Sequence, residues 1–446
     1  MELKRQLGLP TAIFIIIADV IGTGIFMTTG NVLGITGSAA ATLALWAVGG
    51  LVALTGALCY AELATLWPDD GGEYVYLKKI FGLLPAFLTG WISLVVAFSA
   101  AAALSSMTLV LYLNELWPNG PLSGIWAQKI TAAAIICCFG VLHITGVRRG
   151  SFIQNFLTVF KIMIVFSIIV FGLALADWGE VGRLAADYPS ADKNVFHFGF
   201  PLLLIMFAYS GWNGASYMAG EIKNPQKNLP RAMLSATVII TVLYLLLNVV
   251  YLISTPGEGL MGKTAVGAIA TGNLFGPRFS PLFTLGIAFI LLTSVSVQMM
   301  IGPRVYYAMA RDGMIFKSLK KVSPRFGTPH VAIITQMIIA AAYVFIGRES
   351  IETLQAFMGF ALGFFPLLTV SGLVIVRYRH PEMESPYRTP FFPLVPLIYI
   401  TLTAAMMVSA LFTWTTTSLF AVGVCLAGVI VFFIWQKWLG QKTPAG

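Results

Sequence analysis

Runs of mainly apolar residues follow one another along almost the whole chain, and short polar connections separate them. A helical run of about 20 residues crosses the hydrocarbon core of a bilayer, which is ~30 Å thick. Gly, Pro, Asp and Asn mark the connections, as in WPDDGG, WPNGPLSG and KNPQKNLP. The pattern predicts an all-α polytopic membrane protein with twelve spans. These spans, numbered 1 to 12 in chain order, are residues 11–36, 39–66, 84–114, 127–147, 152–176, 196–222, 232–256, 281–311, 331–347, 352–377, 393–413 and 416–437.

Composition agrees with this pattern. Of the 446 residues, 58% are hydrophobic and only 10% are charged, whereas about 25% are charged in a typical soluble domain. The longest polar connections, near 177–195 and 257–280, are too short to build an independent core. We therefore expect residues 1–446 to form a single transmembrane domain.

The basic residues indicate the topology. Most of the 27 Lys and Arg residues lie in connections on the same side as the N-terminus, for example Lys78, Lys79, Arg148 and Arg149. By the positive-inside rule this side is cytoplasmic, and both termini lie there. We expect a plasma (cell) membrane protein whose net charge of +9 reflects this topology and does not indicate a nucleic-acid partner.

Glycine pairs interrupt two of the spans at matching positions. Gly22 and Gly24 lie about half-way through the hydrocarbon depth in span 1, and Gly211 and Gly214 lie in span 6. These spans are five apart, so a five-span unit repeated once would have inverted topology. Paired breaks of this kind point to the binding site of a secondary transporter. The alternative is that these glycines only let helices pack closely.

Unwound helix breaks suit a zwitterionic ligand. The N-terminus of a half-helix presents free N–H groups and a positive dipole end to an anion. Carbonyl groups freed by the unwinding accept hydrogen bonds from an ammonium. An α-amino acid offers one charge to each.

Five motifs, spread over residues 21–396, carry a family resemblance: IGTGIF, CYAELATLWPDDGGEYVYLKKIFG, FAYSGWNGASYMAGEIKNPQKNLPRA, GPRVYYAMARDG and VIVRYRHPEMESPYRTPFFPLVP. With them the sequence resembles the amino acid–polyamine–organocation (APC) transporter family, in its L-type amino acid transporter (LAT) branch. The resemblance implies a LeuT-type fold with discontinuous helices 1 and 6. Its two inverted five-helix repeats would be residues 11–176 and 196–377, followed by two additional helices at 393–437. It also implies sodium-independent amino acid exchange or uptake by alternating access.

The resemblance also implies positions for the substrate. The residues implied to bind the substrate carboxylate are Ile21, Gly22, Thr23, Gly24 and Ile25. Those implied to receive the amino group, mainly through main-chain carbonyls, are Phe207, Ala208, Ser210 and Gly211. Phe207 also falls where family members place an aromatic gate.

A disulfide-linked heavy chain is not expected. Mammalian members of the branch are joined to one through a cysteine after span 3, but the connection NELWPNGPLSGIWAQK has no cysteine. In this the sequence resembles a prokaryotic member. The sequence does not indicate an oligomeric state.

Two charged residues lie within the spans on the cytoplasmic half, Lys161 in span 5 and Asp19 in span 1. Lys161 either snorkels to the surface or, as the LAT branch implies, occupies the place of a sodium ion, and we expect sodium independence on that basis. Asp19 departs from the family, which usually has Ser, Thr or Asn there. It either pairs or exchanges a proton with Lys161, or faces the substrate and selects an added positive charge, or is held neutral by its surroundings.

Two further charged residues are candidates for an inner gate. Arg304 lies in the cytoplasmic half of span 8, and Glu221 lies at the end of span 6. The alternative is an interfacial ion pair or two solvated side chains.

Other classes find little support. GEGLMGKT at 257–264 fits the Walker A pattern, but it follows a membrane helix on the outer side instead of a strand. No HExxH, GxSxG or paired-cysteine motif is present. We therefore expect no enzyme, no cofactor and no metal site. A channel would expose a continuous pore, whereas this chain has isolated charges and two broken helices.

The expected function is a sodium-independent exchanger of small or medium neutral L-amino acids. Two alternatives remain open. One is a proton-coupled amino acid symporter, and the other is a carrier of cationic amino acids or polyamines selected by Asp19.

Overall fold

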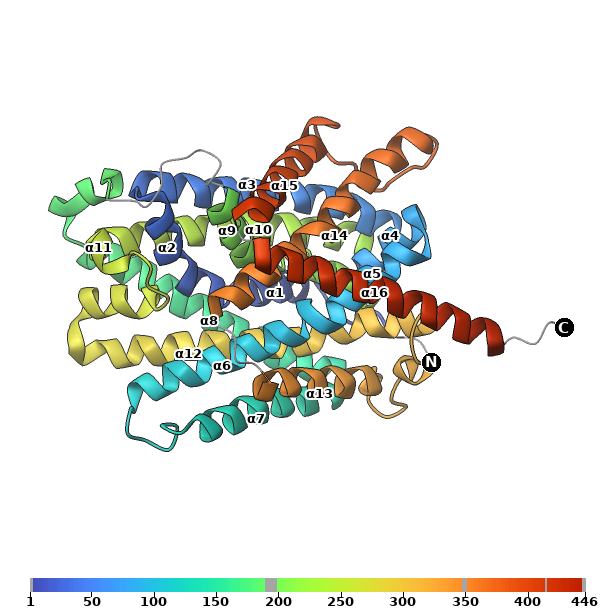
Figure 1. The fold of residues 1–446 in the computed structure, drawn as a ribbon, viewed down its shortest axis with the longest axis horizontal. Helices are drawn as coiled ribbons and strands as arrows, with labels where there is room; N and C mark the ends of the chain where they lie inside the picture. Colours follow the sequence, from blue (N-terminus) through green and yellow to red (C-terminus); the bar gives the residue numbers. More distant parts are fainter. Residues whose placement is uncertain (1–2, 189–198, 347–350, 414, 443–446) are drawn as a thin grey trace.

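Helices account for nearly all of the chain in a computed structural model, which describes residues 3–188, 199–346, 351–413 and 415–442. The long helices run side by side along the longest dimension of the molecule (Figure 1). Within the described ranges, β-type pairing is limited to two isolated bridges, Leu7 with Ile222 and Ser38 with Asp187. An all-α architecture is therefore confirmed for the described residues.

The first nine α-helices are α1 (Leu9–Val20), α2 (Thr23–Thr36), α3 (Ala39–Leu66), α4 (Glu73–Phe81), α5 (Leu83–Ile92), α6 (Ser99–Leu116), α7 (Ile125–Ile144), α8 (Val147–Leu175) and α9 (Gly199–Tyr209). The others are α10 (Pro225–Ser254), α11 (Gly257–Leu260), α12 (Val266–Arg311), α13 (His330–Ile346), α14 (Ile351–Arg379), α15 (Leu394–Thr413) and α16 (Thr415–Lys442). A π-helical turn, Ser93–Ala97, joins α5 to α6, and 3-10 segments lie at Trp178–Ala185, Gly214–Glu221 and Lys317–Lys320.

Each of the twelve expected spans coincides with helical chain, but not all of these helices are long. Among the described residues, nine helices are long and apolar enough to cross a membrane, or ten if α1 and α2, bent by 41°, form one span. Span 6 coincides with α9 and the segment Gly214–Glu221, and its first residues, 196–198, lie outside the described residues. Span 9 coincides with α13, which has 17 residues.

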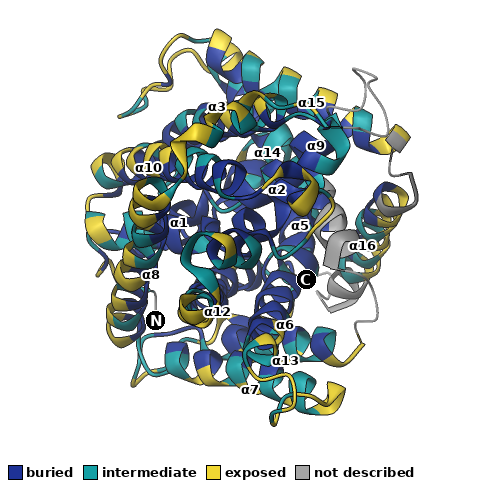
Figure 2. Cartoon of the chain, turned by 90° about the vertical axis from the view of Figure 1, so that its left-hand side faces the viewer, coloured by how far each residue is buried: buried dark blue, intermediate teal, exposed yellow. Residues whose placement is uncertain are grey.

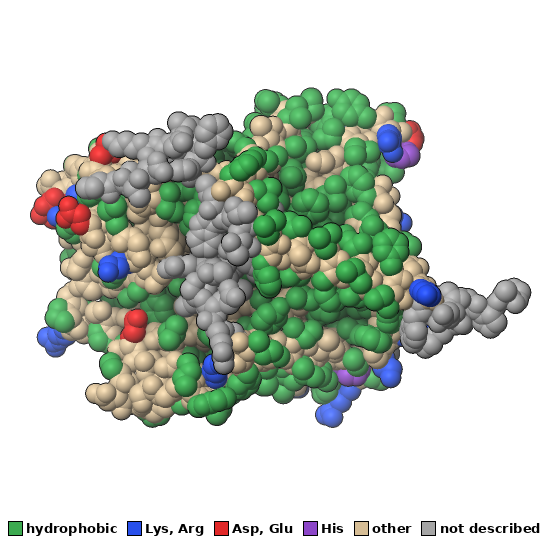
Figure 3. All heavy atoms as spheres, viewed as in Figure 1, with side chains coloured by type: hydrophobic (Ala, Val, Ile, Leu, Met, Phe, Trp, Pro, Cys, Tyr) green, Lys and Arg blue, Asp and Glu red, His purple; other side chains and the backbone are tan. Residues whose placement is uncertain are grey.

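The distribution of side chains fits a protein that crosses a bilayer along its long axis. Figure 3 shows charged side chains mainly toward the two ends of that axis and hydrophobic side chains over much of the surface between them. Exposed residues lie on outer helices such as α7, α8 and α10, whereas α1 and α2 are buried near the centre (Figure 2). The phenylalanines Phe152, Phe156 and Phe166 of α8 are exposed, as expected of a helix that faces lipid.

A short helix, α4, lies in a connection that the sequence pattern leaves as a loop. Gly71 and Gly72 precede it with φ of 116° and 53°, a region that glycine enters without steric cost. This turn directs the chain back toward the bundle, and Gly71 N donates to Tyr217 O at 3.0 Å. As a result, the first residue of α4, Glu73, is buried.

Candidate functional site

The break in span 1 lies between α1 and α2. Ile21 and Gly22 have non-helical backbone angles, and α2 begins at Thr23. A Cβ on Gly24 would lie 2.4 Å from the Cα of Ala208, which is closer than packed atoms allow. Glycine at position 24 therefore lets the backbones of α2 and α9 approach each other at the break.

The break in span 6 follows α9. Gly211 has φ of 102°, and the chain resumes as a 3-10 segment at Gly214. A Cβ on Gly211 would lie 2.7 Å from an oxygen of Asp19. The two breaks therefore face each other, as the matching glycine pairs lead one to expect.

A cavity that is partly open to solvent lies between the two breaks. Its lining from the first break is Asp19, Val20, Gly22, Thr23 and Gly24, and from the second Phe207, Ser210, Gly211, Trp212 and Asn213. Three of the expected substrate residues, Ile21, Ile25 and Ala208, are buried behind the lining. Their side chains pack in the core, so only their backbones belong to the breaks.

The first turn of α2 gives the cavity an anion-binding end. Gly22, Thr23 and Gly24 line the cavity at the start of this helix. The first N–H groups of a helix have no acceptor within the helix, and the dipole is positive there. A carboxylate placed against this turn accepts hydrogen bonds without competing with the helix.

The carbonyls of the second break already have donors. The Tyr244 hydroxyl oxygen, on α10, lies 3.0 Å from Ala208 O and 2.7 Å from Val20 O, so this group bridges the two breaks. Phe207 O accepts from Ser210 N at 3.1 Å and from Ser210 Oγ at 2.7 Å. Position 244 was not singled out in the sequence, because an apolar span does not show which of its faces meets the site.

Lys161 is fully buried and does not snorkel. Its ammonium donates to Ala18 O at 2.8 Å, to Ile21 O, and to Ser294 Oγ at 3.1 Å. An ammonium has three N–H donors, so each finds an acceptor. Lys161 thus ties α8 to the end of α1 and, through Ser294, to α12.

Asp19 faces the cavity, and its carboxylate has no hydrogen bond or ion pair with the described residues. Gly211 and Gly214 lie against it. Asp19 and Lys161 both lie near the first break, but they form no ion pair in this conformation. The charges of the two residues still act on each other, so the two groups lie close together without a salt bridge.

Glu73 is a site residue that the sequence analysis missed. It lines the cavity and is 5% exposed. Its carboxylate accepts hydrogen bonds from Asn213 Nδ2 at 2.7 Å, Tyr217 OH at 3.2 Å and Thr89 Oγ1 at 3.2 Å. The Gly-Gly pair before it was the available signal for a sharp turn back toward the bundle.

The two candidates for the inner gate form a buried ion pair. Arg304 Nε lies 2.7 Å from Glu221 Oε1, with side chains 2% and 0% exposed. Beside them, Gly220 N donates to Asp70 Oδ1 at 3.0 Å. Burial, and then the neighbouring Glu221 carboxylate, raise the pKa of Asp70 to about 8. The N-terminal segment covers this cluster, because Gln6 N and Leu7 N both donate to Glu221 O.

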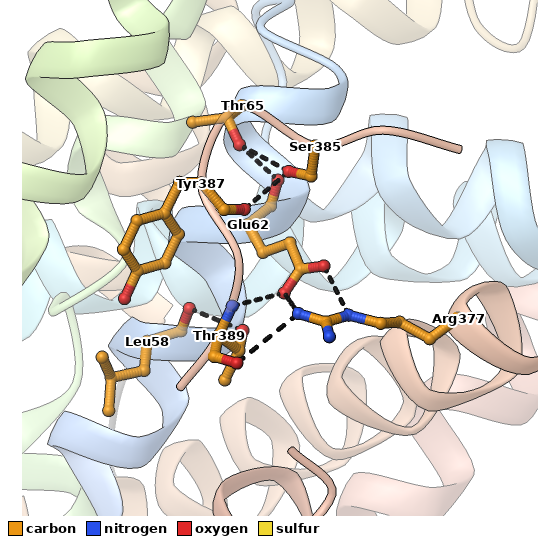
Figure 4. A network of polar contacts seen from close by, with 7 residues as sticks. All are labelled: Leu58, Glu62, Thr65, Arg377, Ser385, Tyr387 and Thr389. Carbon is orange, nitrogen blue, oxygen red and sulfur yellow. Dashed lines mark hydrogen bonds and ion pairs between the residues drawn. The ribbon is translucent and has the colours of Figure 1, made fainter. Parts of the chain in front are cut away.

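A second, partly buried ion pair lies outside the cavity lining and was also missed (Figure 4). Arg377 of α14 makes a two-pronged contact with Glu62 of α3, at 2.7 and 2.6 Å. Thr389 N donates to the same carboxylate at 2.7 Å. This cluster ties α3 to α14 and to the connection that follows α14.

Comparison with known proteins decides the family. The family model described as Amino acid permease matches residues 7–438. The chain belongs to this family. The human b(0,+)-type amino acid transporter 1 is 32% identical over 97% of this permease and 88% of its own length. The serine/threonine exchanger SteT of Bacillus subtilis is 31% identical over 98% of both chains, and the human cystine/glutamate transporter is 30% identical over 98% of the permease and 87% of its own length.

These relatives confirm the resemblance to LAT-type transporters of the APC family that the motifs indicated. They are amino acid transporters and exchangers, so the permease is a multi-pass membrane transporter and not an enzyme.

Proposed function

We propose that this permease is a sodium-independent exchanger of small or medium neutral L-amino acids that works by alternating access. The observation that carries the proposal is the pair of broken helices that face each other across one cavity. A relative, SteT, is named a serine/threonine exchanger, which favours small neutral substrates. We place the protein in the cell membrane with both termini cytoplasmic, on the distribution of Lys and Arg.

The substrate would lie between the breaks. Its carboxylate accepts from the free N–H groups of Gly22, Thr23 and Gly24, and its amino group lies at the span 6 break around Phe207 and Ser210. Carbonyl oxygens have two lone pairs, so those of the break can accept from the substrate beside their present donors. Phe207 is the candidate aromatic gate over the substrate, because it lines the cavity.

Sodium independence rests on Lys161. In transporters with broken helices, unwound carbonyls coordinate the coupling ion. Here the ammonium of Lys161 donates to the carbonyls of Ala18 and Ile21 and to the hydroxyl of Ser294. A fixed cation that holds these oxygens leaves no role for Na⁺.

Alternating access requires the cytoplasmic side to open and close. The Arg304–Glu221 ion pair joins the end of span 6 to span 8, and we propose that it is the inner gate and breaks when the cavity opens inward. For the fold we propose twelve spans, with repeats at 11–176 and 196–377 and two additional helices at 393–437. We expect no disulfide-linked heavy chain, because the connection at residues 114–129 contains no cysteine.

One alternative, proton-coupled uptake, is favoured by a specific observation: the unpaired Asp19 carboxylate near Lys161 offers a site for a proton. The other alternative, a carrier of cationic amino acids or polyamines, would use the same carboxylate. The experiment below separates these from exchange.

Purified protein in liposomes, with a panel of labelled amino acids, tests the proposal. Uptake of neutral amino acids that requires internal amino acid and does not change when Na⁺ is replaced by choline is the expected result. Uptake into empty vesicles driven by an inward proton gradient indicates a symporter, and uptake confined to lysine or polyamines indicates a cation carrier. Flux that neither saturates nor shows counterflow indicates a channel.

A further inference from the structure

The charge of the cavity is one-sided. Two carboxylates, those of Asp19 and Glu73, lie in its lining, and none of the described lining residues is Lys, Arg or His. In the interior of a membrane protein an uncompensated carboxylate is costly. The cavity therefore favours an occupant that brings a positive charge.

The two carboxylates are not equivalent. Glu73 accepts hydrogen bonds from Asn213, Tyr217 and Thr89, which compensate for lost water. Asp19 has no such donor among the described residues, although it faces the same cavity. Asp19 thus has acceptor capacity to offer a ligand, and Glu73 has little.

The basic side chains near the cavity already have other hydrogen-bond or ion-pair partners. The three donors of Lys161 are matched by Ala18 O, Ile21 O and Ser294 Oγ. Arg304 pairs with Glu221. Neither side chain forms an ion pair with Asp19. The charge of Lys161 acts on this carboxylate from nearby, but a cation hydrogen-bonded directly to it would come from the ligand.

The main-chain acceptors of the span 6 break are partly used. Phe207 O has two donors from Ser210, and Ala208 O has the Tyr244 hydroxyl. Asp19 lies against the same break, with an oxygen 2.7 Å from the Cβ position of Gly211 and 3.3 Å from that of Gly214. A hydrogen bond from an ammonium to a carboxylate is about twice as strong as one between neutral groups.

We propose that Asp19 binds the α-ammonium of the substrate, so that this permease recognises the amino group through a side-chain charge beside the main-chain carbonyls. The ligand class is a small molecule with an ammonium next to a carboxylate. Its carboxylate meets the N–H groups at the start of α2, and its ammonium meets Asp19, three residues before Gly22 in the chain. The inference rests on the proposed function, because it assumes that the cavity holds an amino acid.

The test is equilibrium binding of labelled alanine to purified protein, with exchange in liposomes measured in parallel. Asp19→Asn keeps the shape and replaces the charge-assisted bond, and we expect it to raise the Kd for alanine ~10- to 100-fold. Asp69→Asn is the matched control, since Asp69 is an exposed carboxylate outside the cavity, and it should bind alanine as the unaltered protein does. Size-exclusion chromatography and thermal unfolding establish whether each variant folds.

A second arm uses the unaltered protein only and so does not depend on a folded variant. Ethylamine, which has an ammonium alone, should compete with alanine, whereas propionate and N-acetylalanine should compete at least tenfold less well. Failure of ethylamine to compete, or competition by propionate or N-acetylalanine equal to that of ethylamine, overturns the proposal.

The remaining outcomes also support or overturn the proposal. An unchanged alanine Kd in a folded Asp19→Asn protein overturns the proposal. If that variant also loses lysine binding, Asp19 recognises a second positive charge on the substrate. If it instead loses proton-driven uptake, Asp19 couples transport to protons. Alanine binding that depends on Asp19 without any exchange supports the proposal and contradicts the exchanger. Absence of amino acid binding to the unaltered protein overturns both.

Discussion

Arg304 and Glu221 form an ion pair that is closed to solvent, with Nε 2.7 Å from Oε1. Removal of one partner from a buried pair leaves the other charge uncompensated, at a cost of ~3–5 kcal/mol. We expect Arg304→Met to lower the thermal stability of the purified protein strongly and to slow exchange. The double variant Arg304→Met with Glu221→Leu should recover most of the stability but not the exchange rate. Recovery of exchange in the double variant contradicts a gating role for the pair.

Lys161 holds the end of α1 through its three hydrogen bonds, so Lys161→Met should reduce exchange at least tenfold. The variant removes the Lys161 donor from Ala18 O and leaves Ile21 O with Ser294 Oγ, at 3.2 Å, as its remaining side-chain donor. Initial rates in liposomes, with and without Na⁺, measure the effect. The control is Lys79→Met, because Lys79 is exposed on α4. A folded Lys161→Met protein that exchanges normally without Na⁺ is incompatible with a cation-surrogate role.

Gly24→Ala should abolish exchange and destabilise the protein. The added methyl group would lie 2.4 Å from the backbone of Ala208, so the two breaks have to separate. Gly423→Ala on α16 is the matched control, since nothing lies within 4 Å of its Cβ position, and alanine is the better helix former. Thermal unfolding and exchange should show normal behaviour for the control alone.

Tyr244→Phe keeps the ring and removes the hydroxyl that bridges the two breaks. Because the single O–H proton shared by Val20 O and Ala208 O is lost, we expect a loss of ~1–3 kcal/mol in stability and a raised KM for alanine. Tyr378→Phe, on an exposed tyrosine of α14, should change neither quantity. An unaltered KM with lowered stability restricts Tyr244 to a structural role.

Asp70, beside the Arg304–Glu221 pair, should make the stability of the protein depend on pH. Its pKa rises from 3.8 to about 8 in the folded protein, chiefly because it is buried. Between these values the folded state retains a proton that the unfolded state has lost, so the contribution of Asp70 to stability falls as pH increases from 4 to 8. The thermal midpoint of Asp70→Asn, relative to that of the unaltered protein, should therefore rise over this range. A constant difference at all pH values contradicts the assignment.

Hydrophobic runs and glycine pairs predict the helices and the two facing breaks, because helix length and backbone freedom are local properties. They do not predict which partners meet at the site. Counted in residues from the start of their spans, Asp19 and Lys161 lie at a similar depth in the bilayer. The direction of each side chain around its helix depends on packing, however, and the Lys161 ammonium is directed to backbone oxygens and not to the Asp19 carboxylate. Tyr244 and Ser294 were missed for the same reason, since their helices are apolar on most faces. Glu73 was missed because its position depends on a turn within a connection.

The contact between Glu62 and Arg377 joins residues 315 positions apart in the chain. During synthesis, α3 is made long before α14. The Glu62 carboxylate on α3 therefore forms its bonds to Arg377 and Thr389 N only after those residues have been made. A chain that ends before residue 377 contains every cavity residue contributed by α1 to α12, yet it lacks Arg377 and Thr389, which hydrogen-bond the buried Glu62 carboxylate in the structure. The part of the permease that is made last thus supplies the partners of a charge that is made early.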